Sequence, residues 1–170
     1  MDTITREQAA RVLEIVDAGL VGGMGNPVPG ELCVEAAVCL ALGLPHGDNP
    51  SCVAPALRAY KIRLNDAKWS SAAARATGLR RLALALLGSA GALDEAEFVR
   101  RLVTEAIGYS VPIALRAAEK RHPDEGNKTA MLAAADACEK DQTEANARAA
   151  EAAAAEAAAE AAEAAAVGAV

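Results

Sequence analysis

The chain has 170 residues, a formal net charge of −6 and only 2% aromatic residues. This length suits one folded domain, and the alanine-dominated C-terminus leaves about 120 residues to build a hydrophobic core. Apolar residues make up 53% of the chain, but because much of this is alanine, each residue buries little surface and packing must be close and helical. No apolar signal segment or membrane-length apolar run is visible, which predicts a cytoplasmic protein without a membrane partner. The four cysteines are therefore expected to be reduced thiols.

A first helix is expected from Thr3 or Thr5 to about Gly19, where apolar residues recur at helical spacing. Segment 19–30, GLVGGMGNPVPG, then holds five glycines and two prolines, which predicts a turn. Such a loop before a helix can also bind phosphate through its amides. It matches no phosphate-loop pattern, however, and Glu31 would repel an anion there. A connecting turn is the favoured interpretation.

Residues 31–42 are apolar nearly all round, which predicts a central, buried second helix that Gly43 ends. A turn with the sequence LPHGDNP leads to a third helix, which begins near Ser51 and has Pro55 in its first turn. The inner face of this helix carries Leu57, Tyr60 and Leu64.

A fourth helix is predicted from Ser70 or Ser71 to Gly88, preceded by Trp69, whose large ring is expected to close the base of the core. Gly78 lies inside this helix and indicates a close helix crossing, because glycine costs about 1 kcal/mol there relative to alanine. A fifth helix is predicted to start at Asp94 and to be kinked or divided by Pro112.

The remaining residues are expected to form a long helix, since alanine is the strongest helix former. Glu156, Glu160 and Glu163 share one side of it and leave an alanine surface opposite. That surface could dock within the chain, pair with a second copy, or belong to a solvated tail. The predicted fold class is all-α, a compact bundle of five or six short helices plus a long Ala/Glu-rich C-terminal helix. The expected domains are a helical core domain, 1–122, and an alanine-rich helical tail, 123–170.

Three of the four cysteines lie within 30–52, so candidate chemistry is concentrated there. Cys33 would occupy the first turn of its helix, where the helix N-terminus lowers a thiol pKa, as for a cysteine nucleophile. This one helix is superficially similar to the first helix of papain-like and cell-wall peptidases. The candidate base His46 follows at the opposite helix end, about 20 Å away by helical rise. His122 is the other option, and a buried, unreactive Cys33 is the simpler interpretation.

Zinc is the metal that would suit ligands converging on the turn at 43–50. The spacing C-x6-H-x5-C lacks the close ligand pair of a strong zinc motif, so we expect no cofactor. The candidate ligands are Cys39, His46, Asp48 and Cys52.

Charge is unevenly distributed along the chain, with a net of +6 over residues 58–81 and −7 over residues 122–170. The basic region could bind nucleic acid or another polyanion, could attract the acidic tail, or could simply face water. The sequence offers no helix-turn-helix pattern or aromatic platform for nucleic acid. The candidate polyanion-binding residues are Arg58, Lys61, Arg63, Lys68, Arg75, Arg80 and Arg81.

The block from Cys33 to Ser89, beginning CVEAAVCLALGLPHGDNPSC, resembles a family of uncharacterised bacterial and phage proteins with alanine-rich tails. The resemblance spans about residues 19–89 and implies one natural domain, but no activity. The favoured function is a non-enzymatic helical protein-interaction module that binds a protein partner or self-associates. Nucleic-acid or polyanion binding, and a small cysteine or zinc enzyme, are the alternatives.

Overall fold

The computed structural model describes the backbone of residues 4–167 and the side chains of residues 4–162. Helices are the regular elements of this part of the chain, so the predicted all-α class is confirmed. Its one β feature is an isolated antiparallel bridge between Gly25 and Leu32. The elements in chain order are α1 (Arg6–Asp17), α2 (Val34–Ala41), α3 (Pro55–Asp66), α4 (Ala72–Ala85), α5 (Glu95–Glu105), η1 (Ala106–Ser110), α6 (Val111–Glu119), α7 (Glu125–Lys140) and α8 (Glu144–Val167).

The chain divides into two compact units, Met1–Phe98 and Val99–Val170. The division lies at Phe98 rather than at residue 122, where the sequence predicted the end of the core domain. The physical reason is that Ile107 and Leu115, which precede residue 122, are buried against α7 and α8. The tail is therefore not a separate helix but part of a second small bundle.

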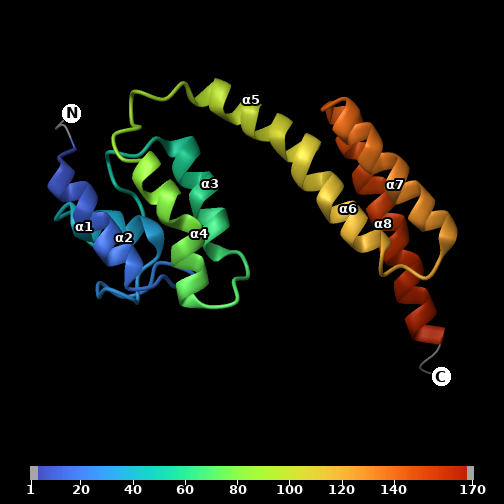
Figure 1. Ribbon diagram of the computed structural model, residues 1–170, viewed down its shortest axis with the longest axis horizontal. Helices are drawn as coiled ribbons and strands as arrows, with labels where there is room; N and C mark the ends of the chain where they lie inside the picture. Colours follow the sequence, from blue (N-terminus) through green and yellow to red (C-terminus); the bar gives the residue numbers. More distant parts are fainter. Residues whose placement is uncertain (1–3, 168–170) are drawn as a thin grey trace. The chain divides into compact units, whose positions relative to one another are not determined.

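The N-terminal unit is built around α2, as its apolar composition predicted. Val34, Ala36, Ala37 and Val38 are all completely buried, and α1, α3 and α4 pack around them (Figure 1). Helix α2 begins three residues later than expected, because the chain at 31–33 is still extended and pairs with the glycine-rich loop. Small residues on α2 allow this close packing on several sides.

Trp69, which the sequence predicted to close the base of the core, lies between α3 and α4. Its ring packs partly buried against the core, and its Nε1 donates to the Leu64 carbonyl at 2.9 Å. A Cβ on Gly78 would overlap this ring. The close approach predicted at Gly78 is therefore made by the tryptophan ring rather than by a second helix.

The C-terminal unit consists of η1, α6, α7 and α8 together with the part of α5 after Phe98. The π-helical turn η1 lies directly before Pro112, so the chain passes the proline as one continuous helical segment instead of being divided (Figure 1). The core of this unit is small and consists of Ile107, Leu115, Met131, Ala135, Cys138, Ala150 and Ala157.

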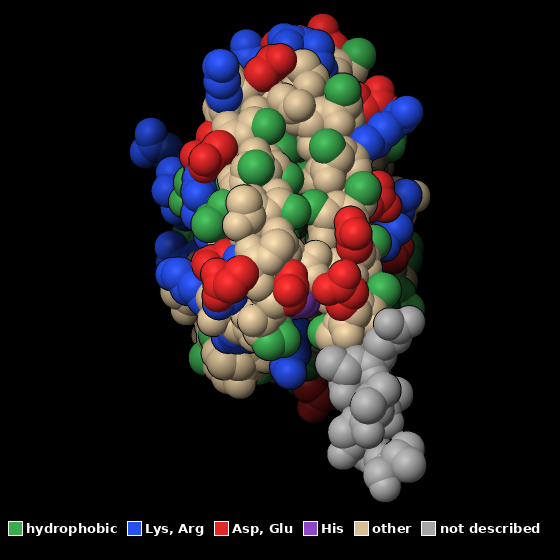
Figure 2. Space-filling view, turned by 90° about the vertical axis from the view of Figure 1, so that its right-hand side faces the viewer, with side chains coloured by type: hydrophobic (Ala, Val, Ile, Leu, Met, Phe, Trp, Pro, Cys, Tyr) green, Lys and Arg blue, Asp and Glu red, His purple; other side chains and the backbone are tan. Residues whose placement is uncertain are grey.

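Helix α8 docks within the chain, one of the three alternatives for the alanine surface. Ala150 and Ala157 are 2% and 4% exposed, and they lie seven residues apart on the side of α8 that packs against α7. Glu160 accepts a hydrogen bond from the Asn127 amide at 2.5 Å, while the side chain of Glu163 lies outside the described residues. On the face seen in Figure 2, apolar side chains are separated by backbone and carboxylates instead of forming one patch. Among the described residues, no helix combines the length and apolarity needed to cross a membrane.

Candidate functional site

Cys33 is the N-cap of α2 and not a residue of its first turn. Its Sγ accepts a hydrogen bond from the Ala36 amide at 3.3 Å, as a serine or aspartate cap would do. The side chain is 5% exposed, and burial raises the pKa of the thiol. The expected activation by the helix N-terminus is therefore outweighed by desolvation, and Cys33 is a capping residue with a protonated thiol.

A buried ion pair joins α2 to α3 one turn beyond this cap. Lys61 Nζ lies 2.8 Å from Glu35 Oε2, and the two side chains are 0% and 1% exposed. Burial raises the pKa of Glu35 and lowers that of Lys61, in both cases against the effect of the opposite charge beside it. Beyond this pair, neither the Glu35 oxygens nor the Lys61 ammonium has a hydrogen-bond partner among the described residues.

Sequence reasoning missed this pair, although the signal was present. Glu35 is the one charged residue in the apolar run 32–42, and a charge on a helix that is buried all round requires a partner. Lys61 was instead predicted to belong to a polyanion-binding surface. That prediction is wrong for Lys61, because its ammonium is completely buried.

Asn65 connects the same two helices to the glycine-rich loop. Its Oδ1 accepts from the Val34 amide at 3.2 Å, and its Nδ2 donates to the Val21 carbonyl at 2.9 Å and to Asp66 Oδ1 at 3.0 Å. Asp66 in turn accepts from the Gly23 amide at 2.8 Å, and these two hydrogen bonds lower the pKa of its carboxyl. The loop amide that phosphate binding would use is thus already bonded to a carboxylate.

The pocket beside this network, here called the Glu35 pocket, has a volume of about 60 Å³. It lies at the junction of the glycine-rich loop, the start of α2 and the end of α3. Three of its lining residues are acidic, and the lysine that pairs with Glu35 does not line it. The lining residues are Gly23, Met24, Cys33, Val34, Glu35, Asp48, Ile62, Asn65 and Asp66.

The candidate zinc ligands do not converge. Cys39 is buried, and desolvation raises its pKa to about 11, while Cys52 is half-buried. His46 Nε2 donates to the Gly25 carbonyl at 3.1 Å, so this ring nitrogen is bonded to backbone. Asp48 lies 3.8 Å from Arg58. Within residues 4–162, no group of three or more such side chains is placed to hold a metal ion.

The basic region is largely used to hold the N-terminal unit together. Arg75 donates to the Asn65 and Leu20 carbonyls at 2.8 and 3.0 Å. Arg80 forms two hydrogen bonds with Asp17, at 2.7 and 3.0 Å. With Lys61 buried and Arg58 beside Asp48, the exposed cations of the predicted surface without such a contact are Arg63, Lys68 and Arg81.

The second histidine also has a structural contact. His122 Nε2 donates to the Ala157 carbonyl at 3.0 Å, which ties the end of α6 to α8. It therefore holds the helical tail in place, and its ring nitrogen is occupied by backbone.

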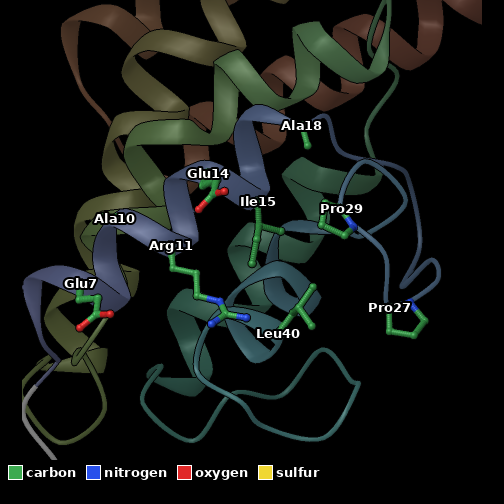
Figure 3. Close-up of a pocket in the computed structure, with 9 residues that line it drawn as sticks. All are labelled: Glu7, Ala10, Arg11, Glu14, Ile15, Ala18, Pro27, Pro29 and Leu40. Carbon is green, nitrogen blue, oxygen red and sulfur yellow. The ribbon is translucent and has the colours of Figure 1, made fainter.

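A shallow groove of about 760 Å³ runs between α1, α2 and the proline-bearing part of the loop (Figure 3). Its apolar lining includes Ile15, Leu40 and Pro29, and the charged side chains of Glu7 and Arg11 come from α1. The groove is open to solvent rather than enclosed.

Exposed large apolar side chains concentrate on the segment formed by α5, η1 and α6. Four of the six that the described residues contain lie there: Val99, Val103, Tyr109 and Ile113, which are 45–68% exposed. Helix α5 is the most amphipathic helix of the structure, yet after Phe98 it packs against no other described helix of its own unit. Its exposed Val99 and Val103, with the half-buried Leu102 beside them, are here called the α5 surface.

The chain was compared with protein families, curated proteins and solved structures. No protein family matches the chain, and no curated protein or solved structure matches it either.

Proposed function

We propose that this protein is a non-enzymatic helical interaction module that self-associates through the α5 surface. The observation that carries the proposal is that α5, the most amphipathic helix, leaves its apolar side without a packing partner in its own unit. An amphipathic helix gains most of its stability from packing of its apolar side. Covering its apolar side with a second helix would stabilise both.

A second copy of the chain is the partner that this surface suits best. Val99 and Val103 lie one turn apart, with Leu102 beside them, so two α5 helices can bury the same residues against each other around a two-fold axis. The contact is small for a specific interface, so we expect a dissociation constant on the order of micromolar or weaker. The alanine surface of α8 contributes less to association, because Ala150 and Ala157 are already buried within the unit.

Solution mass across a range of protein concentrations tests the proposal. The wild-type chain is expected to shift from its monomer mass of 17.3 kDa towards twice that value as concentration rises. Val103→Glu should remain monomeric, because it places a charge in the centre of the interface. Ala118→Glu adds the same charge at an exposed position on α6 and should behave as wild type. A wild type that stays monomeric at millimolar concentration, or equal dissociation by both variants, would refute self-association.

The structure offers less support for the two alternatives. Polyanion binding loses Lys61 to the buried pair, and Arg75 and Arg80 to contacts within the N-terminal unit. A cysteine enzyme would need a reactive thiol, whereas burial raises the pKa of Cys33, Cys39 and Cys138. Neither is proposed.

A further inference from the structure

A second groove lies on the N-terminal unit, where α3 and α4 meet beside Trp69, and is here called the Trp69 groove. It has a volume of about 500 Å³. Its lining is mostly apolar and includes the half-buried side chains of Tyr60, Leu64 and Leu82 as well as the Trp69 ring. Large apolar side chains that are half-buried keep part of their surface in water, so a partner that covers them is stabilised by hydrophobic burial.

The two aromatic rings of the groove are held in place by contacts within the unit. Trp69 Nε1 donates to the Leu64 carbonyl at 2.9 Å, and the ring lies against Gly78. The Tyr60 ring packs edge-on against Phe98, with 6.2 Å between the ring centroids. Because both rings are fixed before a partner binds, ordering them costs little. They suit an apolar side chain that packs against them better than nucleic-acid bases, which stack on freely exposed ring faces.

Three exposed cations border the groove and have no ion pair or hydrogen bond with another described residue. Arg81 is itself a lining residue, while Arg63 and Lys68 directly precede the lining residues Leu64 and Trp69 in the sequence. None of the residues that line the groove is acidic. This charge distribution favours a negatively charged partner and disfavours a basic one.

We propose that the Trp69 groove binds an acidic segment of a partner protein. A large apolar side chain of that segment packs against Trp69, and carboxylates next to it meet Arg63, Lys68 and Arg81. Burial of the apolar side chain supplies most of the affinity, because exposed charge contacts contribute little each and mainly select and orient the partner. The groove belongs to the N-terminal unit and the α5 surface to the C-terminal unit, so this proposal does not depend on self-association.

Fluorescence of Trp69, the one tryptophan of the chain, reports on the groove directly. The probe is a synthetic alanine-based helical peptide with leucines along one side, glutamates next to them and no aromatic residue. Titrating it into the full chain is expected to change the fluorescence in a saturable way, with weaker binding as salt is raised. Replacing its leucines by alanine should weaken binding about tenfold or more, and replacing its glutamates by glutamine should remove the salt dependence. An unchanged fluorescence, or equal binding of the leucine-free peptide, would overturn the proposal.

Charge variants test whether the peptide binds at the groove. Arg81→Gln should weaken its binding about threefold, as expected for the loss of one exposed charge contact. Arg6→Gln is the matched control, because it removes the same charge from an exposed position on α1 that does not line the groove, and it should leave the affinity unchanged. Equal weakening by both variants would show that overall charge attracts the peptide and would refute binding at the groove. An oligothymidine of the same net charge as the peptide tests the other class of anionic partner, and tighter binding of this DNA would overturn the proposal in favour of nucleic acid.

Discussion

Substituting the two residues of the buried ion pair, first singly and then together, tests how much the pair contributes to the stability of the N-terminal unit. Lys61→Met leaves Glu35 as an unpaired buried carboxylate, and Glu35→Met leaves an unpaired buried ammonium. Methionine is unbranched and a good helix former, so neither variant loses helix propensity on α2 or α3. Each single variant should lose about 3–5 kcal/mol of unfolding free energy, because one buried charge is left uncompensated.

The double variant should recover most of this loss. With both charges replaced, the desolvation penalties disappear together, and an apolar pair of similar volume is expected to be neutral or stabilising by up to about 4 kcal/mol relative to wild type. Because a domain is stable by only about 5–15 kcal/mol, a single variant can come close to unfolding. The recovery by the second substitution is therefore the informative result.

Urea unfolding followed by tryptophan fluorescence measures the stability of the N-terminal unit, which contains the ion pair. Trp69 is the one tryptophan of the chain and packs against the core of the N-terminal unit. Arg63→Met, an exposed position on α3, is the matched control and should change stability little. If the double variant is less stable than both single variants, the ion pair stabilises the fold outright and the reasoning above is wrong.

The pH dependence of the single variants follows from the directions of the pKa shifts. Burial raises the folded-state pKa of Glu35 above its ordinary value of 4.5, so in Lys61→Met the folded state binds the proton more tightly than the unfolded state. Relative to wild type, that variant should therefore be least destabilised below pH 4.5 and become more destabilised as pH rises through the folded pKa. Burial lowers the pKa of Lys61 below 10.5, so Glu35→Met should be least destabilised relative to wild type above pH 10.5 and become more destabilised as pH falls. Urea unfolding of wild type and variants over this pH range measures the difference.

Three further changes test packing and thiol chemistry. Gly78→Ala should destabilise the N-terminal unit by about 1–3 kcal/mol, because its Cβ would overlap the tryptophan ring. The control Thr77→Ala, at the exposed neighbouring position, should not destabilise it. An increase in the thermal midpoint of Gly78→Ala would contradict this packing. Ala150→Asp should release α8 and speed its amide hydrogen exchange, because it buries a charge against α7. The control Ala149→Asp, at an exposed position, should leave the exchange rate unchanged. Equal exchange rates of the α8 amides in the two variants would show that α8 is not docked. Native alkylation at neutral pH should label the half-buried Cys52 before the three buried thiols, and peptide mass mapping that finds another thiol first would refute the burial argument.

The sequence predicted the elements of the N-terminal unit well, because their signals are local. The apolar run at 31–42, the serine before α4 and the proline at the start of α3 are each recognisable without knowledge of the fold. The shift of the α2 start from Glu31 to Val34 was missed, since it depends on pairing between Leu32 and the glycine-rich loop. Such pairing joins segments that no periodicity connects.

The boundary between the units was harder to predict, because composition and packing disagree there. Alanine content changes after residue 122, but the bundle that buries Ala150 and Ala157 takes its larger apolar residues from η1 and α6. A helix of small residues cannot supply a core by itself. The folding unit therefore extends towards the N-terminus until it includes enough large side chains, here Ile107 and Leu115.

The candidate sites divide in a related way. The favoured interpretation of Cys33 as a buried, unreactive thiol agrees with its 5% exposure, but its role as a helix cap was not predicted. Lys61, a candidate for the polyanion-binding alternative, is instead a buried counter-charge. The roles are set by which side of a helix faces the core. On α3 the sequence predicted an inner side of Leu57, Tyr60 and Leu64, whereas the buried residues are Leu57, Lys61 and Asn65. Lys61 and Asn65 thus form a polar stripe in the interior.

This polar stripe explains how a core of small residues keeps one arrangement. Alanine-rich helices can slide or rotate against one another at little cost, because small side chains interlock weakly. Asn65 and Lys61 each bond a specific atom near the start of α2, and neither bond survives a one-turn shift of α3. The buried pair is thus expected to contribute more to specificity of packing than to stability. The double Met variant separates these effects: equal stability with broadened amide resonances in the N-terminal unit supports the argument, and equally sharp resonances contradict it.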